Sequence, residues 1–146
     1  MESELTREAY PGLARPRLLV VDDDPALLRA FVRSFRRLYD IRTCLSGEAA
    51  LQELAAGEVD VLVTDYSMPG MSGIDLLQRV RERHPSAGRL MLTAYADAPD
   101  VMELERRGLA SAVLMKPWNR DEVEAGVSRA LESSSARPRV AGPARG

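Results

Sequence analysis

The sequence has a single cysteine, Cys44, among 146 residues. One cysteine permits no internal disulfide and no cysteine-rich zinc site, so we expect a reducing, cytoplasmic setting. No apolar run approaches the roughly 18 residues that a membrane-spanning helix needs. The N-terminus has neither the basic nor the apolar stretch of a secretory signal. We therefore expect neither secretion nor a membrane partner.

Neither sign of charge dominates, because 20 Lys and Arg stand against 22 Asp and Glu, a net charge of −2. A nucleic-acid-binding domain would need a local basic patch, and no nucleic-acid partner is expected. Lysine itself is nearly missing, since Lys116 is the only one in the chain. Arginine meets the general need for positive charge. This indicates that Lys116 serves a purpose that a planar guanidinium does not.

Apolar runs alternate with stretches of helical periodicity along most of the chain. The predicted strands are residues 17–21, 39–44, 59–64, 89–93 and 111–115, and the predicted helices are 25–38, 46–57, 73–84, 98–107 and 119–131. Continuously apolar strands are typical of a parallel sheet covered on both faces. The fold class is therefore α/β, a doubly wound five-stranded parallel sheet with five helices. It forms one domain, residues 16–132, between a flexible N-terminal tail, 1–15, and a disordered C-terminal tail, 133–146.

Polar side chains stand where four of the predicted strands end: Asp22, Asp23, Asp65, Thr93 and Lys116. Ligands of open parallel sheets bind at the carboxyl ends of the strands, so these side chains are expected to converge. Three carboxylates on one rim repel one another unless a cation or a protonation shift relieves them. Oxygen ligands of this kind suit Mg²⁺. An ammonium and a hydroxyl facing the metal supply what phosphoryl transfer needs.

Four motifs carry a family resemblance: Val20 to Pro25, Val63 to Gly73, Leu92 to Ala94 and Lys116 to Trp118. Together, and in this order, they resemble the receiver domain of two-component response regulators, over residues 16–132. The resemblance implies a flavodoxin-like receiver fold with strand order 2-1-3-4-5. It also implies that the chain is not a dedicated enzyme, although it catalyses its own phosphorylation and dephosphorylation.

The resemblance assigns a role to each residue of the rim. Asp65 is the expected phosphoacceptor, which takes a phosphoryl group from a phosphohistidine. Mg²⁺ would be bound by Asp22, Asp23 and Asp65 with the backbone carbonyl of Ser67. Thr93 and Lys116 would hold the phosphoryl oxygens. The resemblance further implies a cis peptide bond between Lys116 and Pro117 and a tight loop exit at Gly73.

The expected partners follow from the same resemblance. A histidine kinase or histidine phosphotransfer protein would meet the first helix, with Arg29 and Arg33, although an ordinary solvated face explains these arginines equally well. A downstream protein would bind the face formed by the fourth predicted helix, 98–107, the fifth strand, 111–115, and the fifth helix, 119–131. Whether the chain forms a homodimer is left open. About 14 residues follow the last helix, too few for an effector domain. A stand-alone switch that signals through protein contacts is therefore expected.

The sequence departs from the family pattern at Val113, where the family often has Tyr or Phe. Either Tyr95 or Trp118 substitutes for this ring, or the activated surface is read without it. Packing is the favoured role of Trp118, and Tyr95, like Ser67, is at a position that tunes phosphoryl hydrolysis in the family. The first alternative function is a scaffold receiver that binds its partner whether phosphorylated or not.

A second alternative is a Mg²⁺-dependent phosphohydrolase of the haloacid dehalogenase type, because Asp22-x-Asp24 fits its motif superficially. That interpretation leaves Asp65 without a role and the chain without a cap for substrates. Asp24, which precedes Pro25, is better explained as the N-cap of the first helix.

Overall fold

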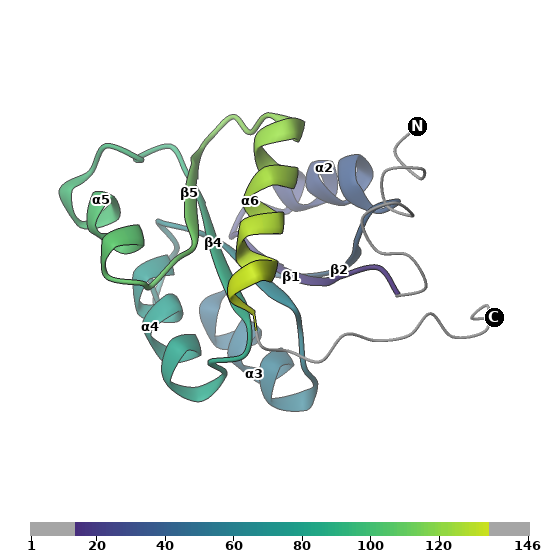
Figure 1. Ribbon diagram of the computed structural model, residues 1–146, viewed down its shortest axis with the longest axis horizontal. Helices are drawn as coiled ribbons and strands as arrows, with labels where there is room; N and C mark the ends of the chain where they lie inside the picture. The colour runs from purple at the N-terminus through teal and green to yellow at the C-terminus, as the bar shows by residue number, and fades with distance from the viewer. Residues whose placement is uncertain (1–13, 135–146) are drawn as a thin grey trace.

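The computed structural model describes residues 14–134, and within them five strands form one sheet (Figure 1). The strands are β1 (Arg17–Val21), β2 (Asp40–Cys44), β3 (Val61–Asp65), β4 (Gly88–Thr93) and β5 (Ala112–Met115). All neighbours pair in parallel, in the order β2-β1-β3-β4-β5. The predicted fold class and strand order are confirmed.

Five helices cover the two faces of the sheet. They are α2 (Pro25–Phe35), α3 (Gly47–Ala56), α4 (Gly73–Arg83), α5 (Pro99–Arg106) and α6 (Arg120–Ser133). Helices α2 and α6 lie on one face, and α3, α4 and α5 lie on the other (Figure 1). Because both faces are covered, the three central strands, β1, β3 and β4, are mostly apolar and buried, whereas the edge strand β2 has exposed polar residues in its middle.

Two apolar cores result from the alternation of side chains along each strand. In β1, Leu18 and Val20 pack toward α2 and α6, whereas Leu19 and Val21 pack toward α3, α4 and α5. All four side chains are almost fully buried. At roughly 1.5–3 kcal/mol for each large apolar side chain, this burial is the main force that holds the helices on the sheet.

Side-chain caps begin most of the helices. Asp24, Ser46, Ser72 and Asn119 each accept a hydrogen bond from a backbone N–H in the first turn of the helix that follows. The cap predicted at Asp24 is therefore confirmed. Among the helices of residues 14–134, α5 alone begins without a side-chain cap, because Ala98 has no acceptor to offer.

The first helix ends earlier than the periodicity predicts. Apolar spacing extends to Leu38, but α2 ends at Phe35, whose carbonyl accepts hydrogen bonds from the N–H groups of both Leu38 and Tyr39 (each 3.0 Å). Leu38 is nevertheless buried, so a turn places it in the core that a continued helix was expected to reach.

The far end of the domain lies slightly beyond the predicted boundary. Helix α6 includes Ser133, and the hydroxyl of Ser134 donates to the Ser86 carbonyl oxygen (2.7 Å). The tails predicted to be disordered lie outside the described residues, except for residues 14–15 and 133–134. No helix in the part of the chain that the structure describes has the length and apolar character to cross a membrane.

Candidate functional site

The strand register brings the predicted site residues to one end of the sheet. Val21 pairs with Thr64, so the next residues, Asp22 and Asp65, stand side by side at the ends of β1 and β3. Asp65 in turn pairs with Leu92, which places Thr93 one residue farther along β4. Lys116 follows β5 directly. Three carboxylates, a hydroxyl and an ammonium thus share the carboxyl-terminal rim, as the sequence predicts.

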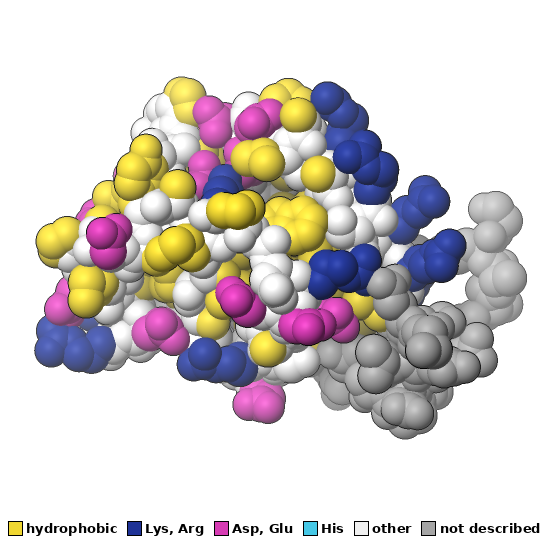
Figure 2. Space-filling model, turned by 90° about the horizontal axis from the view of Figure 1, so that it is seen from above, with side chains coloured by type: hydrophobic (Ala, Val, Ile, Leu, Met, Phe, Trp, Pro, Cys, Tyr) yellow, Lys and Arg dark blue, Asp and Glu magenta, His cyan; other side chains and the backbone are white. Residues whose placement is uncertain are grey.

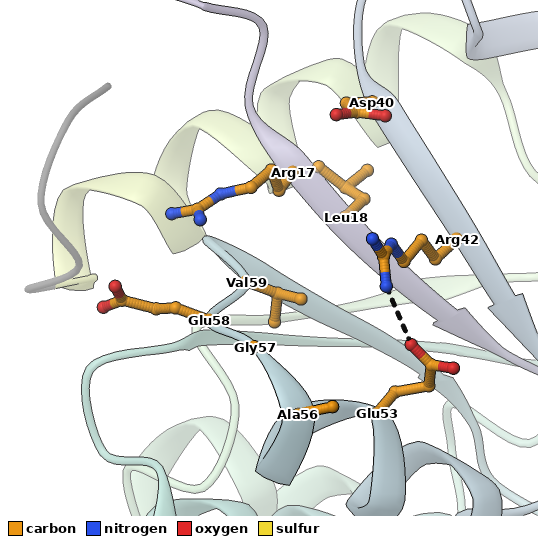
Figure 3. A pocket seen from close by; sticks show the side chains of 9 residues that line it. All are labelled: Arg17, Leu18, Asp40, Arg42, Glu53, Ala56, Gly57, Glu58 and Val59. Carbon is orange, nitrogen blue, oxygen red and sulfur yellow. Dashed lines mark hydrogen bonds and ion pairs between the residues drawn. The ribbon is translucent and has the colours of Figure 1, made fainter. Parts of the chain in front are cut away.

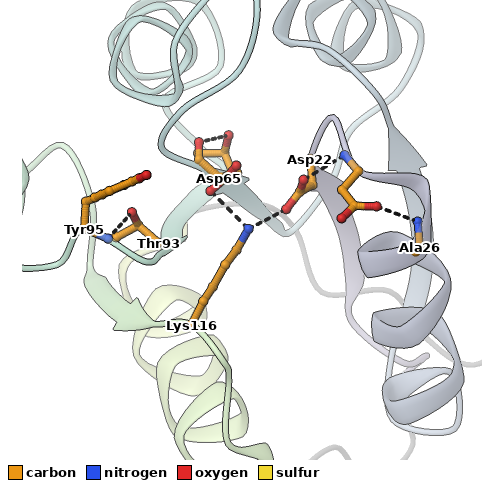
Figure 4. Close-up of polar contacts among 8 residues, drawn as sticks. Asp22, Ala26, Asp65, Thr93, Tyr95 and Lys116 are labelled. Atoms are coloured by element: carbon orange, nitrogen blue, oxygen red, sulfur yellow. Dashed lines mark hydrogen bonds and ion pairs between the residues drawn. The ribbon is translucent and has the colours of Figure 1, made fainter.

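The ammonium of Lys116 lies between two carboxylates (Figure 4). Its Nζ is 2.7 Å from Asp22 Oδ2 and 3.1 Å from Asp65 Oδ1. Asp22 is 6% exposed, and its other oxygen accepts the N–H of Asp24 (2.9 Å). Both oxygens of Asp22 are therefore held in place, which fixes the ammonium next to the phosphoacceptor predicted at Asp65.

Burial and charge act in opposite directions on the ionisable groups of this site. Burial raises the pKa of Asp65, and the neighbouring Asp22 adds to the rise, although Lys116 offsets part of it. Burial alone would lower the pKa of Lys116, but hydrogen bonds and charge from Asp22 and Asp65 raise it instead. Lys116 therefore stays charged, whereas any further positive charge nearby would stabilise the ionised form of Asp65.

The carboxylates fit a divalent cation. Asp22, Asp23 and Asp65 each offer an oxygen within 4.8 Å of the other two. Ligands of octahedral Mg²⁺, each about 2.1 Å from the ion, lie about 3–4 Å apart, so small side-chain adjustments would complete such a set. One ammonium faces three negative charges, which leaves an excess that a hard cation would neutralise.

Thr93 and Ser67 differ in their burial. The Thr93 side chain is fully buried, and its Oγ1 accepts the backbone N–H of Tyr95 (2.9 Å) (Figure 4). Ser67 is exposed in the loop after β3, where it lines a groove with Tyr66 and Asp100. The role predicted for the Ser67 carbonyl stays a prediction.

Asp24 is not part of the acidic cluster. Its carboxylate caps α2 by accepting the N–H of Ala26 (2.9 Å). The Asp22-x-Asp24 pair therefore does not form the two-aspartate centre that a phosphohydrolase of the haloacid dehalogenase type requires, and this alternative loses its support.

The loop that follows Asp65 depends on Gly73. A Cβ at this position would lie 2.0 Å from the backbone oxygen of Asp65, and the Gly73 N–H donates to the Tyr66 carbonyl oxygen (2.9 Å). The start of α4 thus packs directly on the end of β3. The tight loop exit expected at Gly73 is present, and the Lys116–Pro117 peptide bond is cis, as the resemblance implies.

Val113 and Trp118 lie in different apolar cores, on opposite faces of the sheet. Val113 packs with the core beneath α3, α4 and α5, whereas Trp118 packs with the core of α2 and α6. The Trp118 ring lies 6.1 Å from Phe31 and 5.3 Å from Phe35, measured between ring centroids. Trp118 therefore has the packing role that the sequence favours, although its ring neighbours are on α2, and it does not fill space next to Val113.

A different pocket lies at the opposite end of the sheet, where β1 and β2 begin (Figure 3). Its volume is about 250 Å³, and its charged side chains include Arg17, Arg42 and Glu53. Arg42 pairs with Glu53 (3.1 Å), and Arg17 pairs with Asp60 (3.2 Å). Because opposite charges pair there, this pocket has no converging set like the one on the carboxyl-terminal rim.

Comparison with known proteins agrees with this geometry. The model of the response regulator receiver domain family matches residues 18–128. Transcriptional regulatory protein GlrR of Escherichia coli (strain K12) is 33% identical over 119 residues, which are 81% of this chain and 27% of GlrR. Chemotaxis protein CheY of Pseudomonas aeruginosa is 34% identical over 120 residues, which are 80% of this chain and 96% of CheY.

A solved structure shows the same likeness. Response regulator protein TrrA from Thermotoga maritima, in complex with Mg²⁺-BeF, superposes with a TM-score of 0.71 at 30% identity. The match covers 80% of this chain and 99% of the TrrA chain. By contrast, this chain spans only about a quarter of the length of GlrR.

The fold and the rim together define a class, the doubly wound parallel α/β domains with an acidic site at the strand ends. Within that class the family match covers most of the chain. The chain belongs to the response regulator receiver domain family of two-component signalling.

Sequence reasoning missed one set of contacts beside the site. The Tyr66 hydroxyl donates to Asp100 Oδ2 (2.7 Å), and the Tyr66 ring lies 5.9 Å from the Tyr95 ring, measured between centroids. Tyr66 follows Asp65 directly, whereas Asp100 is in the first turn of α5. No local pattern links residues 34 positions apart. The only signal was the presence of two tyrosines next to predicted site residues.

Proposed function

We propose that this chain accepts a phosphoryl group on Asp65 from a phosphohistidine of a histidine kinase or phosphotransfer protein. The observation that carries the proposal is the Lys116 ammonium, held within 3.1 Å of Asp65 by a fully engaged Asp22. A lone structural ion pair would not need a third carboxylate and a buried hydroxyl on the same rim.

The transfer is a displacement at phosphorus. A carboxylate oxygen of Asp65 bonds to phosphorus, the phosphorus–nitrogen bond of the donor breaks, and its electron pair returns to the imidazole nitrogen. The product is an acyl phosphate on Asp65. Lys116 lies 3.1 Å from Asp65, and Thr93 is one residue beyond the strand partner of Asp65, so both would bind phosphoryl oxygens and stabilise the charge that develops there.

Mg²⁺ would be held by Asp22, Asp23 and Asp65, and when bound it neutralises the charge of the phosphoryl oxygens. The rest of the work belongs to the chain itself. Asp22 orients Lys116, and Lys116 exchanges part of its contact with Asp65 for the incoming phosphoryl group. Gly73 keeps the end of β3 in place while this happens. The domain turns over only its own phosphoryl group and is not a dedicated enzyme.

A groove along α2 suits the protein that donates the phosphoryl group. It has a volume of about 540 Å³ and is lined mainly by apolar side chains from α2 and the β2–α3 turn. Two basic side chains, Arg29 and Arg33, also line it. Leu45, at its edge, is 54% exposed. Basic side chains gather over α2 on the face seen in Figure 2. A donor helix with apolar and acidic side chains would match this combination.

A change in the groove should affect a protein phosphodonor but not a small-molecule phosphodonor. Arg29→Glu combined with Arg33→Glu should slow transfer from a purified histidine kinase that phosphorylates the wild-type chain. The same variant should react with phosphoramidate at the wild-type rate, because that donor needs no docking surface. Equal slowing with both donors would contradict the docking role, and unchanged transfer from the kinase would contradict it as well.

We further propose that the signal leaves through the face of α5, β5 and α6, toward a protein partner. Met102 and Met115 on this face are 67% and 55% exposed. The scaffold alternative keeps one supporting observation, the small side chain of Val113, and predicts equal binding of a partner with and without phosphorylation. Stand-alone action stays a prediction.

The direct test is intact-mass spectrometry after incubation with phosphoramidate and Mg²⁺. The wild-type chain should gain one phosphoryl group, and Asp65→Ala should gain none. Asp24→Ser is the matched control, because it removes a carboxylate from the same segment but retains an N-cap for α2. A phosphorylated Asp65→Ala chain, or an unreactive Asp24→Ser chain that folds normally, would overturn the proposal.

A further inference from the structure

Helix α5 is held firmly at its C-terminal end. Arg81 of α4 donates to the carbonyl oxygen of Arg107 (2.9 Å). Arg89 of β4 donates through Nε to the carbonyl oxygen of Leu109 (3.0 Å) and through Nη1 to that of Ala87 (2.9 Å). Two guanidinium groups thus bind the carbonyls of Arg107 and Leu109, which follow the last turn of α5. Positive charge at the C-terminus of a helix also interacts favourably with the helix dipole.

The N-terminal end of α5 is held quite differently. Ala98 supplies no side-chain cap. Asp100 compensates within the first turn by accepting the N–H of Val101 on Oδ1 (3.0 Å). Its other oxygen, Oδ2, accepts the hydroxyl of Tyr66 (2.7 Å). Within the described residues, this is the one hydrogen bond that ties the first turn of α5 to the loop after β3.

The Tyr66 end of this hydrogen bond is linked to the phosphorylation site in two ways. Tyr66 is the residue after Asp65, and its ring packs on that of Tyr95 (5.9 Å between centroids). The backbone N–H of Tyr95 donates to Thr93 Oγ1 (2.9 Å). A movement of Thr93 toward a phosphoryl group would therefore carry Tyr95 with it and disturb the packing of Tyr66.

We propose that the hydrogen bond between Tyr66 and Asp100 is a latch that holds the first turn of α5 in the unphosphorylated chain and opens on phosphorylation. The inference rests on the proposed function for its trigger, the phosphoryl group on Asp65. Thr93 passes the movement to Tyr95, and Tyr95 passes it to Tyr66. Because the C-terminal end of α5 is anchored by Arg81 and Arg89, release at the other end pivots the helix.

The latch accounts for the small side chain at Val113. Val113 packs in the core beneath α3, α4 and α5. Because valine has no ring, position 113 cannot transmit a movement of Thr93 through an aromatic side chain. The route through Tyr95 and Tyr66 runs along the surface instead. Tyr95 is 56% exposed, so its ring has room to move without opening the core.

The test compares Tyr66→Phe with the wild-type chain by amide hydrogen exchange. This substitution keeps the ring and removes only the hydroxyl. The amide of Met102, which bonds to the Ala98 carbonyl oxygen (2.9 Å), should exchange about fivefold faster, the loss expected for one net hydrogen bond. The amide of Leu109, at the anchored end, should exchange at the wild-type rate. Tyr95→Phe is the control, because it removes a neighbouring hydroxyl and should leave both rates unchanged.

Phosphorylation supplies the second arm of the test. Beryllofluoride with Mg²⁺, or a phosphodonor, should speed exchange at Met102 in the wild-type chain and add little in Tyr66→Phe, where the latch is already open. Equal exchange at Met102 in both unmodified proteins would overturn the latch, as would equal acceleration at Met102 and Leu109, which indicates general destabilisation. If the proposed function fails, no phosphoryl adduct forms, yet the comparison of the unmodified proteins still decides whether the latch exists.

Discussion

Gly73→Ala should weaken the fold and the site together. The added Cβ would stand 2.0 Å from the backbone oxygen of Asp65, whereas real Cβ atoms do not approach such atoms within 3.0 Å. Either α4 or the end of β3 must therefore move by at least about 1 Å. Overpacking of this kind against backbone costs about 2–3 kcal/mol, which for a domain of this size lowers the melting temperature by about 10 °C.

Two other glycines provide matched controls. Gly57 has extended backbone and open space around its Cβ position, so Gly57→Ala should change the free energy of unfolding by less than about 0.5 kcal/mol. Gly108 also has open space but a φ of +72°, so Gly108→Ala should cost about 1 kcal/mol from backbone strain alone. Urea unfolding followed by circular dichroism measures all three values.

The order of the three variants tests the reasoning. Gly73→Ala should be the least stable, and it should also react more slowly with phosphoramidate, because the displaced backbone belongs to Asp65. If Gly73→Ala unfolds at the same urea concentration as Gly57→Ala, close packing of α4 on the phosphoacceptor strand is refuted. If it is destabilised but reacts at the wild-type rate, the link between this packing and the site is refuted.

Three further predictions concern the site and the single cysteine. Lys116→Arg should lower the rate of phosphorylation by phosphoramidate at least tenfold in a mass assay, because a planar guanidinium does not reproduce a compact ammonium between two carboxylates; an unchanged rate would remove the reason for a lone lysine. At a concentration 100 times its Kd, Mg²⁺ should stabilise the wild-type chain by about 2.7 kcal/mol, and Asp23→Asn, titrated at the same Mg²⁺ concentrations, should gain clearly less; equal gains would exclude Asp23 as a ligand. Burial raises the pKa of Cys44 from 9.0 to about 11. At pH 8, iodoacetamide should therefore alkylate the native chain about 100-fold more slowly than the urea-unfolded chain, and the rate for the native chain should rise about tenfold per pH unit until pH 11. Equal rates for the two chains at pH 8 would show that Cys44 is not protected.

The three central strands, β1, β3 and β4, were predictable because they are buried on both faces. Runs such as Val61 to Val63 are continuously apolar, and an acid marks where β1 and β3 leave the core. Parallel pairing then brings the strand ends together, so Asp22, Asp65 and Lys116 could be predicted to meet even though they are far apart in the sequence. The register confirms that meeting.

Helix ends were less predictable, since periodicity records only which side chains are buried. Leu38 continues the apolar spacing of α2, and it is buried, yet the chain has already turned at Phe35. A side chain can reach the same core from a helix or from a turn, and the sequence does not distinguish the two.

Contacts between loops were the least predictable part of the site. The hydrogen bond from Tyr66 to Asp100 depends on how α5 is placed over the end of β3, and no local pattern specifies that placement. The same holds for Arg81 and Arg89, which bind backbone carbonyls rather than carboxylates. Charge pairing, the usual signal for such contacts in a sequence, is not involved.

The most direct test of the central claim locates the phosphoryl group within the chain. After reaction with phosphoramidate and Mg²⁺, borohydride reduces an aspartyl phosphate to homoserine, and peptide mapping by mass spectrometry identifies the altered residue. The account predicts homoserine at Asp65, dependent on Mg²⁺, and at no other aspartate. Modification at Asp22 or Asp23, or none in a chain that demonstrably binds Mg²⁺, would contradict it.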